Sequence, residues 1–257
     1  DERWEKALRP FVDRIMVIDD LADRRHDCDL LLDQNMVMNM EHRFSGYVPE
    51  KCTLLLGPKY ALLQPIYAEL HHRIPPREGP IRHILIYFGG ADNDNLTGRA
   101  LNAFLNLKRD DITVDVVISS DSPHAQTIQH QVTGQANICV HSNLPSLAPL
   151  LAKADLAIGA GGATSWERLC LGLPALVITL AENQRQIAHS LHQKSLIRWL
   201  GHKDEVDEQV VQRELKHLLE NDLDPEWGKN CRSIVDGMGT KRVSTILLAN
   251  SETPIKI

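Results

Sequence analysis

Short apolar runs alternate with amphipathic stretches along most of the chain. From residue 83 onward, runs such as HILIYF, TVDVVIS, DLAIG and ALVITL are each followed by a stretch with apolar residues at helical spacing. Strands that alternate with helices build a parallel sheet with helices on both faces. The pattern therefore predicts an α/β domain with strands near 83–88, 113–119, 137–140, 155–159, 175–180 and 196–200.

The first 75 residues show a shorter version of the same pattern. A helix is expected over 2–8, followed by the buried-strand runs RIMVID, CDLLLD and CTLLLG. The segment HHRIPPREGP, residues 71–80, has the composition of a linker between domains. We expect an incomplete α/β domain over 1–75, a second one over 76–238, and a C-terminal helix and tail over 239–257 that could pack back on the first. The opening resembles the middle of such a domain, which suggests that an upstream segment is absent.

Composition narrows the class of protein. Hydrophobic residues make up 43% of the 257 residues and charged residues 24%, which is ordinary for a globular chain. The net charge is −6 and no basic run is present, so nucleic acid is not an expected partner. The longest apolar run, about 169–181, is too short to span a membrane. Five scattered cysteines without a CxxC pair indicate neither a zinc site nor a disulfide framework, so we expect no metal, no cofactor and a cytoplasmic location.

Two predicted strands end in glycine-rich loops, YFGGADNDN (87–95) and GAGGAT (159–164). Glycine lets the backbone approach a ligand closely, and the N–H groups of the following helix can bind a phosphate. Neither loop matches GxGxxG or GxxxxGK[ST], so neither is a dinucleotide or P-loop fingerprint. Tight turns would also explain the glycines. The pattern is typical of a diphosphate site at the carboxyl edge of a sheet.

Three groups of polar residues allow two interpretations each. Glu167 could complete a T-x-x-E capping box that begins at Thr164, or its carboxylate could accept hydrogen bonds from ribose hydroxyls. Asn183 could cap a helix, or it could bind a sugar together with Gln184. His26 lies among Asp27, Cys28 and Asp29 at a spacing that fits no standard metal site, and we interpret it as structural.

Four segments together resemble a known family. They are MVIDDLADRRHDCDLLLDQN, GPKYALLQP, IYFGGADNDNLT and DLAIGAGGATSWERLCLGLPALVITLAENQ. They resemble the UDP-2,4-diacetamido-2,4,6-trideoxy-β-L-altropyranose hydrolases of pseudaminic acid biosynthesis, a route to surface polysaccharide and flagellin glycosylation. That family is similar to the UDP-GlcNAc transferase of peptidoglycan synthesis and shares its GT-B fold. The resemblance implies two Rossmann-like domains, the first incomplete here, and hydrolysis of a UDP-sugar to free sugar and UDP.

The resemblance also implies a UDP site, mostly on the second domain. Gly89, Gly90 and Ala91 would form one side, Ser142 and Asn143 would hold the uracil, and Glu167 would bind the ribose. The diphosphate would meet Gly161, Gly162, Ala163 and Thr164, and the sugar would be reached by Asn183 and Gln184.

The chain departs from the family in two places. The family's GxGHxxR loop carries the histidine proposed as general base, and this sequence has no such motif, so no catalytic residue is assigned. Gln64 stands where the family commonly has Arg in YALLRP. Two alternatives remain open: an inverting UDP-sugar glycosyltransferase of the same fold, and a truncated module that binds UDP without turnover. The sequence does not indicate an oligomeric state.

Overall fold

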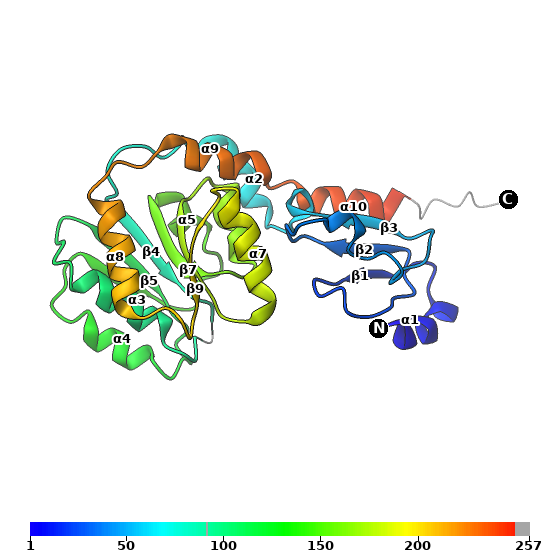
Figure 1. The fold of residues 1–257 in the computed structure, drawn as a ribbon, viewed down its shortest axis with the longest axis horizontal. Coiled ribbons are helices and arrows are strands. Elements are labelled where there is room, and N and C mark those ends of the chain that lie inside the picture. Colours follow the sequence, from blue (N-terminus) through cyan, green and yellow to red (C-terminus); the bar gives the residue numbers. More distant parts are fainter. Residues whose placement is uncertain (91, 250–257) are drawn as a thin grey trace.

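The computed structural model describes residues 1–90 and 92–249, which form two lobes side by side (Figure 1). The larger lobe is built on a six-stranded parallel sheet and the smaller on a three-stranded parallel sheet. The alternation of strand and helix that the sequence predicts is confirmed in both lobes.

The large-lobe sheet has the order β6-β5-β4-β7-β8-β9. Its strands are β4 (His83–Tyr87), β5 (Thr113–Val117), β6 (Ile138–His141), β7 (Leu156–Ala160), β8 (Ala175–Thr179) and β9 (Arg198–His202). The chain adds β5 and β6 on one side of β4, and then returns to place β7 on the other side. The strand order therefore reverses between β4 and β7, which is where open α/β sheets bind their ligands.

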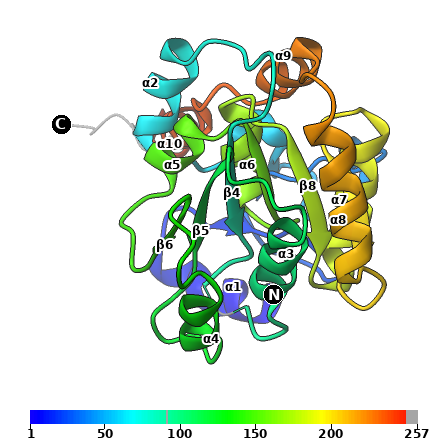
Figure 2. The same ribbon diagram turned by 90° about the vertical axis from the view of Figure 1, so that its left-hand side faces the viewer.

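Helices cover both faces of this sheet. On one side lie α3 (Leu96–Leu105), α4 (Ala125–Gln131) and α8 (Glu208–Leu219), which Figure 2 shows on the near side of the lobe. The other face is covered by α5 (Ala148–Lys153), α6 (Thr164–Cys170), α7 (Glu182–Gln193) and α9 (Pro225–Ile234). Neighbouring residues of one strand enter different cores: Ile84 and Ile86 pack on the first side and Leu85 on the second. Successive side chains of a strand therefore point to opposite faces of the sheet, so only every second one can lie on a given face.

The small lobe contains segments from both ends of the chain. Its strands β1 (Met16–Ile18), β2 (Leu30–Asp33) and β3 (Thr53–Leu56) lie in that order, after α1 (Glu2–Leu8). Short 3-10 turns cover Arg9–Phe11, Met40–His42 and Pro58–Tyr60. The last helix, α10 (Gly239–Ala249), packs Val243 and Ile246 against β2 and β3 beside this sheet (Figure 1).

The segment between the lobes is ordered. Helix α2 (Pro65–Arg73) includes the first three residues of the expected linker, and Arg77 in its remainder is buried. The Arg77 guanidinium donates to the carbonyls of Ala154 at 2.6 Å and Leu151 at 2.7 Å, and also to that of Leu171. These carbonyls lie at the ends of α5 and α6, where helices leave acceptors unpaired. Burial lowers the pKa of Arg77 to about 10. The prolines and charges of this segment suggested a loose linker. The sequence alone does not show that Arg77 donates hydrogen bonds to the carbonyls at the ends of two helices.

None of the helices in the described ranges 1–90 and 92–249 is both long and apolar enough to cross a membrane.

Candidate functional site

The candidate site lies where β4 and β7 end, at the reversal of strand order. Tyr87 of β4 pairs with Gly159 of β7, so the two glycine-rich loops leave the sheet side by side. The loops after β6 and β8 leave the same edge, because all strands of this sheet are parallel. The structure therefore brings the predicted segments from four separate loops to one edge of the sheet.

The three glycines at the end of β7 and in the loop that follows it have different neighbours. A methyl group on Gly159 would lie 2.4 Å from the Tyr87 carbonyl oxygen and 2.8 Å from Nη1 of Arg168. The same group on Gly161 would meet Cγ2 of Thr179 at 3.2 Å, and on Gly162 its nearest contact would be Nε2 of Gln184 at 3.7 Å. Gly159 is therefore needed for packing inside the lobe. Only toward Gly162 does the loop open into space that a ligand could fill.

Arg168 supports this loop from beneath. Its side chain is buried, and Nη2 donates to the Ala160 carbonyl at 2.7 Å and to Ser165 Oγ at 3.0 Å. Burial lowers the pKa of Arg168 to about 10. Arg168 was not among the predicted site residues, although an arginine followed directly by the apolar run LCL in the predicted helix was a signal for a buried partner.

The loop after β4 ends differently from the expectation. Gly89 has φ +101°, a backbone conformation that favours glycine. The buried Asp92 carboxylate accepts the N–H groups of Leu96 and Thr97, each at 2.9 Å, and Asn95 Oδ1 accepts that of Gly98 at 3.2 Å. The first N–H groups of α3 are therefore already bonded. The expectation that they stay free for a phosphate is wrong for this loop, because the Asp92 carboxylate and the Asn95 amide oxygen already accept them.

Two site predictions in this loop have separate outcomes. Gly90 is exposed at the sheet edge, beside Gly89. Ala91 lies outside the described residues.

Helix α6 starts without such a cap. Its N-cap residue is Ala163, whose side chain makes no capping hydrogen bond. The capping-box interpretation of Thr164 and Glu167 is therefore wrong, since a box needs the threonine at the N-cap. Glu167 instead turns to the space between α6 and α2, and its Oε2 atom is buried without a hydrogen-bond partner among the described residues.

Tyr67 of α2 is the neighbour of Glu167. Its side chain is buried, and its hydroxyl lies close enough to the Glu167 carboxylate and to Ser146 for each to affect the other's ionisation or hydrogen bonding. Burial raises the pKa of Glu167, while the Tyr67 hydroxyl acts in the opposite direction. Burial and the nearby Glu167 charge also raise the pKa of Tyr67. The sequence offered no signal for this pair, because one partner lies in the segment that joins the lobes.

The outer loops add exposed polar groups. Ser142 and Asn143 follow β6, and the Asn143 amide donates to Ser120 Oγ at 3.1 Å. Gln184 accepts the Leu180 N–H at 2.8 Å, which ties the start of α7 to the end of β8. Asn183 is exposed within α7, whose N-cap is Ala181, so its interpretation as a helix cap is wrong.

His26 makes its side-chain contacts within the small lobe. Nδ1 of His26 lies 2.8 Å from Glu5 Oε1, and the two side chains tie the loop before β2 to α1. This fits the structural interpretation of His26. Gln64 occupies the exposed N-cap position of α2 and makes no side-chain capping bond there.

Comparisons with known proteins agree with this architecture. The spore coat polysaccharide biosynthesis protein SpsG of Bacillus subtilis is 27% identical over 203 residues, which cover 78% of this chain and 60% of SpsG. An uncharacterized protein of Methanocaldococcus jannaschii, MJ1062, is 28% identical over 194 residues, which are 72% of this chain and 40% of MJ1062. The chain thus spans less than two thirds of the length of either relative.

A solved structure shows the same fold. MurG of Acinetobacter baumannii superposes with a TM-score of 0.63 at 17% identity, over 96% of this chain and 76% of that one. The predicted GT-B fold, with two α/β lobes on parallel sheets, is therefore confirmed.

The family model of the glycosyltransferase family 28 C-terminal domain matches residues 84–235. The match begins in β4, ends just after α9, and includes both glycine loops and Glu167. Because this match covers more than half of the chain, the protein belongs to the family with the glycosyltransferase family 28 C-terminal domain.

Proposed function

We propose that the large lobe binds the diphosphate and ribose of a nucleotide sugar at the ends of β4 and β7, and that the protein takes part in glycosyl transfer for polysaccharide synthesis. The observation that carries this proposal is the buried, unpartnered Oε2 of Glu167 among the described residues, next to an uncapped glycine loop at the strand reversal. A buried acceptor without a donor is unfavourable, and two ribose hydroxyls would supply the donors.

Each predicted site residue that the structure describes has a role in this proposal. The backbone N–H groups of Gly161, Gly162, Ala163 and Thr164 would face the diphosphate, with Gly89 and Gly90 closing the opposite side. Ser142 and Asn143 would meet the base, and Asn183 and Gln184 would face the sugar. The Nε2 donor of Gln184 near Gly162 supports its placement, because its Oε1 already accepts from Leu180 and only the N–H₂ group remains to bind a ligand.

The reaction would break the bond between the anomeric carbon and the diphosphate oxygen. An acceptor hydroxyl attacks that carbon and loses its proton to a base, while the nucleoside diphosphate departs with the bonding electrons. Backbone amides of the glycine loop would stabilise the negative charge that develops on the leaving oxygen. We favour an acceptor alcohol over water because the chain belongs to a glycosyltransferase family and its relative SpsG is named for polysaccharide synthesis.

Hydrolysis is the second candidate, with water in place of the acceptor hydroxyl. The four segments that resemble the UDP-diacetamido sugar hydrolases favour it. The two reactions share the nucleotide site and differ only in the group that attacks the anomeric carbon.

Calorimetric titration with UDP tests the shared site first. We expect stoichiometric binding by the wild type and weaker binding by Glu167→Gln, which keeps the shape of the side chain and removes its charge. Glu220→Gln, on the exposed end of α8, is the matched control and should bind as the wild type does. Equal UDP affinity of all three proteins would refute the assignment of Glu167.

Proton NMR then separates the two reactions. UDP-GlcNAc and the UDP-diacetamido sugar are incubated with the protein, with and without a panel of saccharide acceptors. A glycoside that forms only with an acceptor supports transfer, and free sugar released without one supports hydrolysis. UDP binding with no product in either series would leave the non-catalytic binding module as the correct interpretation.

A further inference from the structure

Four side chains capable of metal binding meet on one face of the large-lobe sheet, away from the glycine loops. Asp115 of β5 pairs in register with Cys139 of β6, and His141 lies two residues further along β6. His83 of β4 lies two residues before Leu85, the register partner of Asp115. Residues in register or two apart point to the same face of a sheet, so the four side chains project together.

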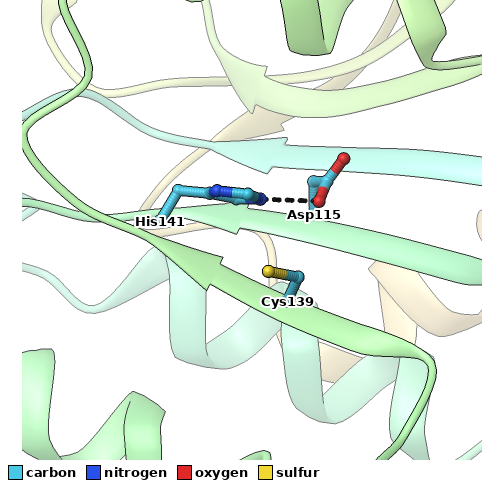
Figure 3. Close-up of side chains that lie close together, drawn as sticks. All are labelled: Asp115, Cys139 and His141. Atoms are coloured by element: carbon cyan, nitrogen blue, oxygen red, sulfur yellow. Dashed lines mark hydrogen bonds and ion pairs between the residues drawn. The ribbon is translucent and has the colours of Figure 1, made fainter.

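The distances within this cluster are short. Ligand atoms of Asp115, Cys139 and His141 all lie within 4.8 Å of one another. Figure 3 shows the His141 ring pointing at the Asp115 carboxylate, with the Cys139 side chain beside them. Nε2 of His141 is 2.7 Å from Oδ1 of Asp115, and Nε2 of His83 is 2.6 Å from Oδ2. The two histidines thus contact different oxygens of the Asp115 carboxylate, His141 at Oδ1 and His83 at Oδ2.

Asp115 is more deeply buried than the other three side chains of this cluster. The Asp115 side chain is only 7% exposed, whereas those of His141 and His83 are 24% and 21% exposed. Cys139 is exposed and free, on the strand at the end of the sheet. An ion could therefore enter from solvent beside Cys139 and reach a carboxylate that is already fixed in place.

We propose that Asp115, Cys139 and His141 bind a divalent cation of the zinc class, with His83 orienting the Asp115 carboxylate from outside the ligand set. Oxygen, imidazole nitrogen and thiolate sulfur together are typical ligands of zinc, whereas magnesium and calcium prefer oxygen alone. A thiolate and a carboxylate balance the charge of the ion. Three protein ligands leave a fourth position for water.

An ion pair without metal is the simpler alternative for part of this cluster. Hydrogen bonds from His141 and His83 hold the pKa of Asp115 below its usual value, although its burial acts to raise it. That network explains three of the residues and leaves the thiol of Cys139 without a role. A metal would replace the proton between His141 and Asp115, and their two ligand atoms would separate to about 3.3 Å, as zinc bonds of about 2.0 Å in a tetrahedron require.

The position of the site suggests what the ion would do. His141 is the last residue of β6, and Ser142 and Asn143 follow it directly. An ion fixed to Cys139 and His141 would hold the end of β6 against β5, and with it the start of that loop. This consequence rests on the proposed nucleotide site, whereas binding of the ion does not.

Calorimetric titration of the untagged, chelator-treated protein with zinc chloride tests the proposal without any nucleotide. We expect one equivalent to bind, more tightly as the pH rises, because the thiol and the His141 contact must lose protons. Because Cys139 is exposed, the Cys139→Ser variant should remain folded, yet it should lose most of its affinity for zinc. His83→Gln should weaken binding about 10–100-fold, as expected for a residue that orients a ligand. His130→Gln, an exposed histidine on α4, is the control and should bind as the wild type does.

Cobalt provides the second readout. Bound cobalt should give a thiolate-to-metal absorption band that Cys139→Ser abolishes and His130→Gln retains. The proposal is overturned if no stoichiometric zinc binds, or if Cys139→Ser and His141→Gln bind zinc and cobalt as the wild type does. UDP titrations with and without zinc then report the effect on the loop at 142–143. Zinc binding with no UDP binding would count against the proposed function alone.

Discussion

The two glycine-rich loops at the strand reversal follow the same pattern in sequence and end in different chemistry. After β4, the buried Asp92 carboxylate and Asn95 take up the first N–H groups of α3. After β7, helix α6 starts at an uncapped Ala163, and Glu167 keeps a buried oxygen with no partner in the described part of the chain. One loop has supplied its own anion, whereas the other has left room for one.

The difference teaches that glycines at a strand end do not by themselves mark a phosphate site. Such a loop can bind a phosphate only if no nearby acidic side chain already accepts the first N–H groups of the helix. Asp92 lies four residues before Leu96, the first residue of α3. Once that helix start is known, the hydrogen bonds from the helix N–H groups to Asp92 can be predicted from the sequence. The first loop would then act as a rigid wall beside the ligand, and the second as its binding surface.

The largest expected effect separates packing from binding within the second loop. Gly159→Ala would place a methyl group 2.4 Å from the Tyr87 carbonyl oxygen, so we expect a loss of about 3 kcal/mol or more in the free energy of unfolding. Gly162→Ala has its nearest contact at 3.7 Å and should unfold within about 1 kcal/mol of the wild type. Urea unfolding measures both. Comparable stability of the two variants would contradict the division of the loop into an inner and an outer part.

The next effect concerns UDP affinity. Glu167→Ala should weaken UDP binding by about 1–3 kcal/mol, since hydrogen bonds to a charged group are lost. Its thermal stability should change little, because the side chain caps no helix. Calorimetry with UDP and thermal unfolding measure the two quantities. Unchanged affinity with a lowered unfolding temperature would show that Glu167 has a structural role instead.

The reciprocal experiment applies to the first loop. Asp92→Ala removes the acceptor of two helix N–H groups and should lower the free energy of unfolding by about 2 kcal/mol. UDP affinity of the protein that remains folded should stay near the wild-type value. A larger loss of UDP affinity in Asp92→Ala than in Glu167→Ala would reverse the assignment of the two loops.

Most of the fold was predictable from the sequence. Apolar runs bounded by glycine or polar residues located the strands, and the strong strand–helix alternation indicated a parallel sheet. The docked segment between the lobes was not predictable, because proline and charge at 71–80 suggested mobility, whereas Arg77 is held by three carbonyls. Contacts between residues that are 74 to 94 positions apart leave no trace in local composition.

The candidate site was predictable in part. Motif resemblance selected Glu167 and the glycine loop. It did not select the two residues beside them: Tyr67 lies outside the quoted segments, and Arg168 lies within one of them but was given no role. The cluster of Asp115, Cys139 and His141 was missed for a related reason. Its ligands come from two strands paired across the sheet, whereas a search for CxxC considers only neighbours in the sequence.

The smallest effect tests how Tyr67 acts on Glu167. Burial raises the pKa of Glu167, and the Tyr67 hydroxyl partly opposes that rise. Tyr67→Phe should therefore raise the pKa further. If UDP binds only when Glu167 is ionised, affinity falls as the pH drops through this pKa, and in Tyr67→Phe the fall begins at a higher pH. Folding responds in the opposite sense. Because the folded pKa of Glu167 exceeds its unfolded pKa, the stability from the protonated carboxyl is full below the unfolded pKa and is lost as the pH rises through the folded pKa.

The measurement is UDP affinity of the wild type and Tyr67→Phe, from mildly acidic to neutral pH. UDP has its own phosphate ionisation in this range, but it affects both proteins equally and cancels in the ratio of their dissociation constants. We expect this ratio to approach one at neutral pH and to grow as the pH falls. A ratio that stays constant across the range would mean that Tyr67 contributes packing alone. A ratio that grows would show that the helix joining the two lobes influences the ionisation of Glu167, the residue proposed to bind the ribose.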